Sequence, residues 1–259
     1  MDIKIPHSLL LNYLDTKATP AEIAKALTLC GPSVDRLTKV GDDVIYETEI
    51  ITNRIDSVSA FGLAREAAAI LPQFGHQAKL INNPYEEKHL SVGVEHDQPL
   101  PLNIQILDQS LVHRFSALVL DNLNVKPSPN LLQHQLESAG IRSLNNLVDI
   151  TNYLTLSLGQ PVHIFDYDKL SEHLLKLRSS KKGETVTTLD HKTHLLRGGD
   201  IVIEDGSGKI IDLCGIMGGL FSEIDEHTKR AVLFVQTYDS KKIRSTSLYT
   251  QERTLAAQI

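Results

Sequence analysis

The fold of this chain depends most on residues Ile141–Phe165, IRSLNNLVDITNYLTLSLGQPVHIF. Apolar side chains recur there at helical spacing, and Gly159 followed by Pro161 stops the predicted helix. The apolar positions are Leu147, Ile150, Leu154 and Leu158. The positions between them are more polar than a plain core helix requires. We therefore expect the apolar side to anchor the segment, while the polar groups near its ends face a pocket.

Composition places the chain among ordinary globular proteins, with 41% hydrophobic and 22% charged residues. No apolar run approaches the roughly 20 residues that a membrane span needs, and the start MDIKIPHSLL has no signal-peptide pattern. Cys30 and Cys214 lie far apart, so they predict neither a disulfide framework nor a metal cluster. We therefore expect no metal site, no membrane contact and a location in the reducing cytoplasm.

The net charge of −6 bears on possible partners. A protein that binds nucleic acid alone usually carries a basic patch and a high pI, whereas the pI here is near 6.0. We find no basic face in the sequence. If RNA is a partner, most phosphate contacts should come from another chain or domain. There is no Trp and the aromatic fraction is 5%, which predicts no extensive base-stacking surface.

Turn signals and composition predict an α+β protein with two domains. A small mixed α/β domain is expected over residues 1–85, a linker over 86–101, and a larger α+β domain over 102–259. Within the first domain, Thr19-Pro20-Ala21-Glu22 has the pattern of a capping box with Pro at the first helical position. The apolar positions from Ile5 to Leu14 predict a short amphipathic helix.

The larger domain is predicted to hold a helix pair and hairpin-rich mixed sheets. Ser128-Pro129 should cap the first helix of the pair, Asn130–Ala139. Two hairpins are expected, the second around Asp205-Gly206-Ser207-Gly208. The predicted strands are Thr185–Leu189, Thr193–Leu196, Ile201–Glu204, Lys209–Leu213 and Ala231–Thr237, and a final helix is predicted over Ser240–Thr250.

His163 is the strongest single candidate for chemistry, because it follows a glycine-terminated helix, where loops place functional groups. The alternative is a histidine that only hydrogen-bonds the backbone. Thr151 and Asn152 offer a hydroxyl and an amide that could bind a polar substrate near the same place, and their alternative role is local back-bonding within the helix.

Three glycines within the five residues Gly215–Gly219 permit positive φ and close backbone approach. The segment could form an anion-binding nest, although a tight structural turn is the more common use of such a pattern. It is not a P-loop, because no Lys-Ser or Lys-Thr follows the glycines. The scattered histidines and cysteines do not match a zinc pattern, and no Gly-x-Ser-x-Gly elbow is present.

Together these residues resemble the β subunit of bacterial phenylalanyl-tRNA synthetase, over essentially the whole chain. The matching blocks occur in the family's order. They are Glu49–Asp56, Gly62–Glu66, Ser128-Pro129, Ala139–Arg142, Asn146–Tyr153, Gly159–Asp166, Gly183-Glu184, Thr188–Asp190 and Gly215–Gly219. The inserted oligonucleotide-binding-like domain of many relatives is absent, because only about ten residues separate Asp35 from Tyr46. The family continues beyond this chain, so we expect an N-terminal piece or a naturally short version of the subunit.

The resemblance implies an editing-type domain that hydrolyses tyrosine mistakenly attached to phenylalanine tRNA. It implies catalytic roles for His163, Thr151 and Asn152, and places Gly215 in the substrate pocket. The implied partners are the synthetase α subunit and phenylalanine tRNA. No cofactor is implied for this chain, since ATP and magnesium would be used by other domains of the full synthetase.

This sequence departs from the family pattern on one wall of the implied pocket. Phe234 stands where the family has a hydroxyl-recognising Glu, Gln236 replaces a small residue, and Cys214 replaces Ala. A phenyl ring cannot accept the phenol hydrogen bond, so we expect discrimination between tyrosyl and phenylalanyl esters to be weakened or lost. The rival interpretation is a non-catalytic assembly or tRNA-docking module with a vestigial pocket. A free-standing deacylase is a third interpretation, and it would need a basic face of its own.

Overall fold

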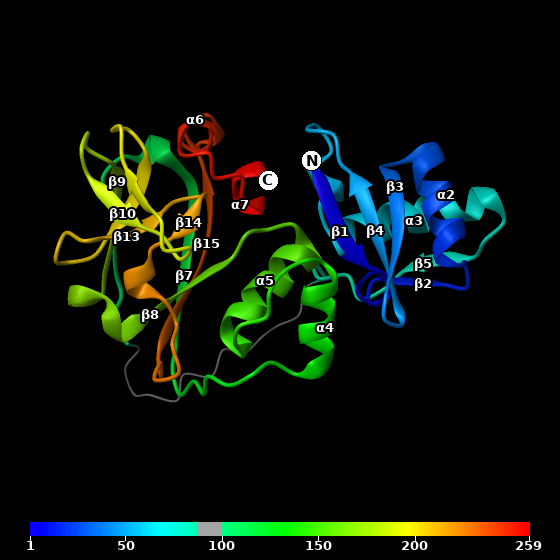
Figure 1. The fold of residues 1–259 in the computed structure, drawn as a ribbon, viewed down its shortest axis with the longest axis horizontal. Coiled ribbons are helices and arrows are strands. Elements are labelled where there is room, and N and C mark those ends of the chain that lie inside the picture. Colours follow the sequence, from blue (N-terminus) through cyan, green and yellow to red (C-terminus); the bar gives the residue numbers. More distant parts are fainter. Residues whose placement is uncertain (87–99) are drawn as a thin grey trace. The chain divides into compact units, whose positions relative to one another are not determined.

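The computed structural model describes residues 1–86 and 100–259, which form two compact units (Figure 1). Unit 1 contains residues 1–86 and 127–160 with Ile259, and unit 2 contains residues 100–126 and 161–258. The predicted linker lies outside the described residues except at its two ends. The sequence prediction assigned residues 127–160 to the second domain, whereas the structure groups them with unit 1. None of the described helices has the length and apolar character to cross a membrane.

Unit 1 contains a three-stranded antiparallel sheet and a separate strand pair. The sheet order is β1 (Asp2–Pro6), β4 (Asp43–Glu49), β3 (Ser33–Val40), and the pair joins β2 (Leu14–Thr16) to β5 (Ala78–Leu80). The predicted helix over Ile5–Leu14 is wrong. The first six of those positions are divided between β1 and the four-residue α1 (His7–Leu10), because Ile3 and Ile5 alternate with exposed residues and face the core of a sheet.

Five helices accompany these strands, and their ends follow local side-chain chemistry. The capping box of α2 (Pro20–Cys30) is confirmed, since the Thr19 hydroxyl accepts from the Glu22 amide and Glu22 accepts from the Thr19 amide. Ser59 caps α3 (Ala60–Ile70) by accepting from the Gly62 amide. The helix pair is α4 (Asn130–Ser138) and α5 (Asn146–Leu158), and short 3₁₀ turns occupy Ile55–Ser57 and Leu71–Phe74.

A buried carboxylate joins the two helices of the pair. Asp149 on α5 is fully buried and accepts from the hydroxyls of Ser128 (2.5 Å) and Ser143 (2.6 Å) and from the Leu144 amide (2.9 Å). The prediction that Ser128 caps α4 is therefore wrong, because its hydroxyl is engaged by Asp149 and Pro129 is the cap residue without a side-chain bond. The start of α5 is set by Asn145, which accepts from the Leu147 and Val148 amides.

Unit 2 is built from a five-stranded sheet, a three-stranded sheet and a hairpin (Figure 1). The five-stranded order is β14 (Met217–Gly218), β13 (Ile210–Leu213), β12 (Ile201–Glu204), β9 (Leu174–Ser179), β6 (Asn103–Ile106), and the three-stranded order is β7 (Val112–Leu120), β15 (Ala231–Tyr238), β8 (His163–Asp166). β6 and β9 are parallel, and the remaining pairs in both sheets are antiparallel. The hairpin pairs β10 (Thr185–Thr187) with β11 (Thr193–Leu195).

The two sheets of unit 2 share one apolar core, which includes Phe165, Leu175, Val202, Leu213 and Phe234. Both predicted hairpins are present, and α6 (Ser240–Thr250) has the predicted bounds. The remaining short elements are α7 (Leu255–Gln258) and the 3₁₀ turns Gln109–Leu111, Tyr167–Lys169, Ser171–His173 and Leu220–Ser222. The predicted α+β class, with hairpin-rich mixed sheets, is confirmed.

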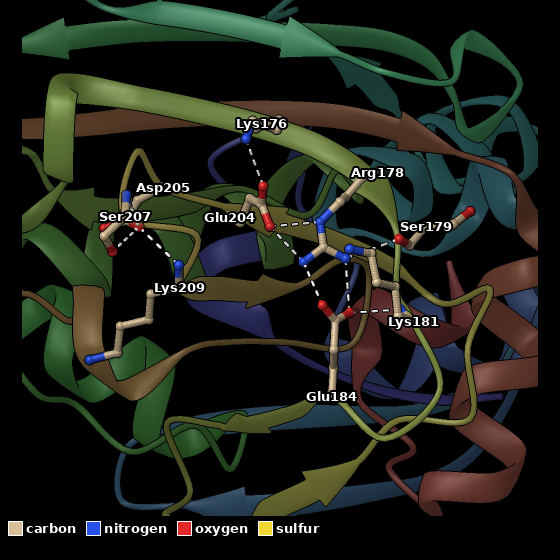
Figure 2. Close-up of polar contacts among 9 residues, drawn as sticks. All are labelled: Lys176, Arg178, Ser179, Lys181, Glu184, Glu204, Asp205, Ser207 and Lys209. Atoms are coloured by element: carbon tan, nitrogen blue, oxygen red, sulfur yellow. Dashed lines mark hydrogen bonds and ion pairs between the residues drawn. The ribbon is translucent and has the colours of Figure 1, made fainter.

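An ion network fixes the turn that follows β9 (Figure 2). The Arg178 guanidinium, largely buried, donates to Glu204 on β12 (Nε to Oε2, 2.7 Å) and to both carboxylate oxygens of Glu184 (2.8 and 2.9 Å). Lys176 binds the second oxygen of Glu204 at 2.7 Å. The guanidinium holds the pKa of Glu184 below its usual value. Because Glu184 also accepts from the Lys181 amide at 2.6 Å, the turn is tied to two strands at once.

Candidate functional site

His163 begins β8 in unit 2 and lies directly opposite Phe234 on β15. Residues opposite each other in an antiparallel pair share one face of the sheet. The two rings accordingly meet edge to face, with centroids 5.4 Å apart and planes at 85°. The edge-to-face contact of His163 with Phe165 is closer, at 4.9 Å. The sheet therefore holds the imidazole against two phenyl rings.

Gly218 on β14 lies against Nε2 and Cε1 of the imidazole. A Cβ atom at this position would lie 2.2 Å from His163 Nε2 and 2.4 Å from Cε1, closer than real contacts allow. Glycine is thus required here for close approach rather than for a positive φ. The Gly218 carbonyl accepts from the Leu189 amide at 3.0 Å, so this strand is fixed where it meets His163.

Burial lowers the pKa of His163 to about 4. The imidazole is therefore neutral near pH 7, with one nitrogen that can accept a proton and one that can donate a hydrogen bond. A neutral imidazole can orient a water molecule and take its proton, although a base with so low a pKa is weaker than an ordinary histidine.

Phe234 is both beside His163 and within the core. Its ring is 1% exposed and stacks on Phe165 at 4.5 Å with planes at 17°, and on Phe115 at 6.2 Å. The stack leaves an apolar wall next to the imidazole. Gln236, two residues along β15, shares the face of Phe234 and lies opposite Phe115 on β7.

A second group of polar side chains lies in the same core, at Asp212, Cys214 and Tyr238. Asp212 and Cys214 are buried, Tyr238 is partly buried with its hydroxyl inside the core, and burial raises the pKa of Asp212 to about 7. Burial, reinforced by the Asp212 carboxyl, raises the pKa of the Cys214 thiol well above its usual value. Burial likewise raises the pKa of Tyr238. Asp212 lies opposite Gly218 on β14, so its side chain leaves the sheet on the face that meets His163.

Asp212 and Tyr238 were not among the residues predicted from the sequence, although each carries a signal. Asp212 interrupts the apolar run Ile210–Leu213, where a carboxylate is unusual in a buried strand. Tyr238 continues the alternation of Phe234 and Gln236 on one face of β15. The bulge that re-aligns Tyr238 with Val112 cannot be read from the sequence.

The glycine-rich segment forms a tight turn followed by β14. Gly215 has φ +67°, and a Cβ there would lie 2.7 Å from Ile243 Cδ1 on α6. The neighbouring amides of Cys214, Ile216 and Gly219 donate to the carbonyls of Ile201, Leu213 and Ile211. These amides are occupied, so the anion-nest interpretation is wrong for them and the structural turn applies.

Thr151 and Asn152 lie on α5 in unit 1, whereas His163, Cys214, Gly215, Phe234 and Gln236 lie in unit 2. Thr151 is buried, and its hydroxyl donates to the Val148 carbonyl at 2.7 Å. This is the local back-bonding that formed the alternative role for Thr151. Its hydroxyl oxygen keeps lone pairs that can accept a hydrogen bond.

Metal-ligating side chains do not gather in either unit. Over residues 1–86 and 100–259, no three or more His, Cys, Asp or Glu side chains are placed to hold a metal ion. Both cysteines are free thiols, with Cys30 exposed and Cys214 buried.

Comparison with known proteins gives a consistent family. The family model described as the B3/4 domain matches residues 111–258. The phenylalanine–tRNA ligase β subunit of Streptococcus pyogenes serotype M3 is 40% identical over 207 residues, which cover 80% of this chain and 24% of that protein. The β subunit of Carboxydothermus hydrogenoformans is 36% identical over 228 residues, which cover 88% of this chain and 27% of that protein. The chain spans about a quarter of the length of the curated relatives it matches.

A solved N-terminal fragment of the phenylalanyl-tRNA synthetase β subunit from Pyrococcus horikoshii aligns with 100% of this chain and 74% of its own. The identity is 13% and the TM-score is 0.49.

Proposed function

This chain belongs to the B3/4 domain family, and from that premise we propose that it is part of a phenylalanine–tRNA ligase β subunit and acts there as an editing-type hydrolytic domain. Its substrate is the ester that joins an amino acid to phenylalanine tRNA. The observation that carries the proposal is the neutral His163 imidazole, held between two phenyl rings and a glycine strand.

The chemistry needs little more than a positioned water, because an aminoacyl ester is already activated. His163 accepts a proton from the water while the water oxygen forms a bond to the ester carbonyl carbon. The carbonyl oxygen becomes an oxyanion, which hydrogen-bond donors in the pocket stabilise. The carbon–oxygen bond to the terminal ribose then breaks, and the ribose oxygen takes the proton from His163. The products are the free amino acid and tRNA with an intact hydroxyl.

Phe234 determines the selectivity of the proposed site. A pocket that hydrogen-bonds the tyrosine hydroxyl can reject phenylalanine by a factor of roughly 10⁴ or more, because the apolar ring leaves a polar group unpaired. The stacked ring of Phe234 offers no acceptor. We therefore propose that this domain discriminates weakly between tyrosyl and phenylalanyl esters, with Gly215, Cys214 and Gln236 as further pocket residues.

The second candidate function is a non-catalytic assembly or tRNA-docking module. The observation that favours it is the deep burial of Phe234 among Phe115 and Phe165, which makes that wall an ordinary part of the core. In both proposals the partners are the synthetase α subunit and phenylalanine tRNA, in the cytoplasm. ATP and magnesium would serve other domains of the assembled ligase.

A deacylation assay tests the proposal. The purified chain is mixed with tyrosyl- and phenylalanyl-tRNAPhe, and release of each amino acid is compared with spontaneous hydrolysis. We expect the two catalysed rates to lie within about tenfold of each other, and His163→Ala to lower both by about 10²-fold or more. Phe234→Glu should raise the preference for the tyrosyl ester, since it restores an acceptor.

Phe234→Leu is the matched control, because it keeps the wall apolar and should leave the two rates similar. Circular dichroism of each variant verifies that it is folded. Rapid hydrolysis of the tyrosyl ester alone by the unaltered chain would refute the loss of selectivity. Rates equal to spontaneous hydrolysis, with tRNA binding intact, would support the docking module instead.

A further inference from the structure

An open cleft, of about 890 Å³, lies in unit 2 beside α6. It is lined by polar and basic groups from the turn before β12 and from α6. They include Arg197, Gly199, Asp200, Lys241, Lys242 and Tyr249. None of these residues belongs to the proposed hydrolytic site. Three of these residues, Arg197, Lys241 and Lys242, are basic, whereas the chain as a whole has a net charge of −6.

The turn after β9 brings two further lysines to this region. Gly198 has φ +92°, and a Cβ there would lie 3.1 Å from the Lys182 amide nitrogen. The turn of Lys181 and Lys182 thus lies directly against Gly198, next to Arg197. The Arg178–Glu184 network holds this turn through the Lys181 amide (Figure 2). Positions 181–182, 197 and 241–242 therefore form one basic cluster from three separate segments.

The carboxylates of the region, Asp200, Asp239 and Asp108, are fewer than the five cations of this cluster and are held by local hydrogen bonds. Asp200 is buried and accepts from the hydroxyls of Ser180 and Thr246, both at 2.8 Å. Asp239 caps α6 by accepting from the Lys242 amide at 2.9 Å. Asp108 lies near enough to Lys242 for the lysine to lower its pKa slightly, after its hydrogen bonds from Ser110.

The cations of the cluster are mostly free to meet a ligand. Lys181, Lys182, Arg197 and Lys241 are exposed. Arg197 packs over the Tyr249 ring at 4.4 Å, which limits its freedom to move. Lys242 donates to the Gly199 carbonyl at 3.3 Å. Arg197, Lys241 and Lys242 therefore line an open polar cleft, and Lys181 and Lys182 lie on the turn that packs against Gly198 of its lining.

We propose that this cleft binds the phosphodiester backbone of RNA. Successive phosphates are the ligand that matches several cations along an open groove, and lysine and arginine are the side chains that contact them. The choice of RNA as the polyanion rests on the proposed function. The cleft then supplies phosphate contacts within this chain, whereas the sequence analysis expected them from another chain or domain.

Binding of a fluorescently labelled phenylalanine tRNA transcript to the full chain tests this inference. Anisotropy titrations are run between 50 and 200 mM salt, with the double variant Lys182→Ala plus Lys241→Ala. No hydrogen bond from either side chain is found in the described parts of the chain, so both changes should leave the fold intact. We expect the variant to bind several-fold to tenfold more weakly near 0.1 M salt, and the slope of log affinity against log salt to fall by about 1 to 2.

Lys209→Ala plus Lys229→Ala is the matched control. Both lysines are exposed, and they lie at the ends of β12 and β15 that are remote from the cleft. The control should bind like the unaltered chain. Equal weakening by both double variants, or binding that neither changes, would overturn the proposal. Competition by anionic vesicles or free phosphate at the concentrations that suffice for RNA would also overturn it.

These binding results are independent of hydrolysis. If the chain binds the transcript through the cleft but releases no amino acid, the hydrolytic function is refuted and RNA binding in the cleft is supported. If the unaltered chain hydrolyses the ester, and the Lys182/Lys241 variant has the same rate and the same affinity for the transcript, the hydrolytic function is supported and RNA binding in the cleft is refuted.

Discussion

Burial shifts the pKa values of His163 and Asp212 in opposite directions, to about 4 and about 7. The folded protein binds fewer protons at His163 than the unfolded chain does between pH 4 and 6.5, so this residue makes stability rise with pH over that range. It binds more protons at Asp212 between pH 3.8 and 7, so this residue makes stability fall as pH rises. The two contributions therefore offset each other over most of the acidic range.

Single substitutions should separate these contributions. Asp212→Asn removes the contribution that lowers stability as pH rises. We therefore expect the free energy of unfolding of this variant to rise by about 3 kcal/mol between pH 4 and 6.5. His163→Gln removes the contribution that raises stability as pH rises. The free energy of unfolding of this variant should therefore fall by about 4 kcal/mol between pH 4 and 7. Urea titrations at half-unit pH steps measure both slopes.

The unaltered chain is the reference, and its stability should vary less over pH 4–6.5 than that of either variant. Cys214 and Tyr238 stay neutral throughout, because burial raises the pKa of both. If both variants keep the slope of the unaltered chain, the opposing shifts are not present in solution.

Individual residues differ in how far the sequence could predict them. His163 was found because a glycine-terminated helix and Pro161 precede it. Phe234 was found because it departs from a family pattern. The contact between His163 and Gly218 could not be predicted, because it joins strands 55 residues apart and depends on the packing of two sheets.

Elements whose signals are local were predicted well. The capping box of α2, both hairpins and the bounds of α6 follow from residues within a few positions of each other. β3 (Ser33–Val40) was missed, because five of its eight residues are exposed and it lacks strict alternation. Its strand state comes from pairing with β4, which propensity does not report.

The helix pair depends on a contact that its own propensities do not provide. Asp149→Ala removes the acceptor for the hydroxyls of Ser128 and Ser143 and for the Leu144 amide. Donors that are buried and left unpaired lose their water bonds without compensation. We expect the free energy of unfolding of unit 1 to fall by about 3 kcal/mol or more, measured by urea denaturation with far-ultraviolet circular dichroism.

Asp149→Asn is the control for this prediction. It keeps one acceptor oxygen and nearly the same volume, so it should destabilise unit 1 by less than Asp149→Ala. An exposed helix residue, Leu131→Ala, should change stability little, since Leu131 is 66% exposed. Equal losses for Asp149→Ala and Leu131→Ala would show that the buried carboxylate does not hold the pair.

The whole chain is interleaved in a way that sequence order conceals. Residues 127–160 interrupt unit 2 and belong to unit 1, where α5 packs on α3, and Tyr153 accepts a hydrogen bond from Asn12 at 3.3 Å. Turn signals and composition predict one linker, over residues 86–101, and give no sign that residues 127–160 return to unit 1. The basic cluster is concealed for the same reason, since its lysines and arginine are up to 61 positions apart in sequence.

A fragment that starts at the predicted boundary, residues 102–259, tests this interleaving. It keeps α4 and α5 but lacks the rest of unit 1, so Leu147 and Leu156 lose their buried surroundings. We expect the backbone amides of α5 to exchange hydrogen at nearly unprotected rates in the fragment, whereas those of β12 and β15 stay protected as in the full chain. Hydrogen–deuterium exchange with mass spectrometry locates the protection.

A matched variant replaces residues 127–160 with a flexible Gly-Ser linker, and it should keep the same protection in β12 and β15. If α5 is as protected in the fragment as in the full chain, the helix pair folds with residues 102–259, and the boundary predicted from the sequence describes the folding unit better than the contacts do.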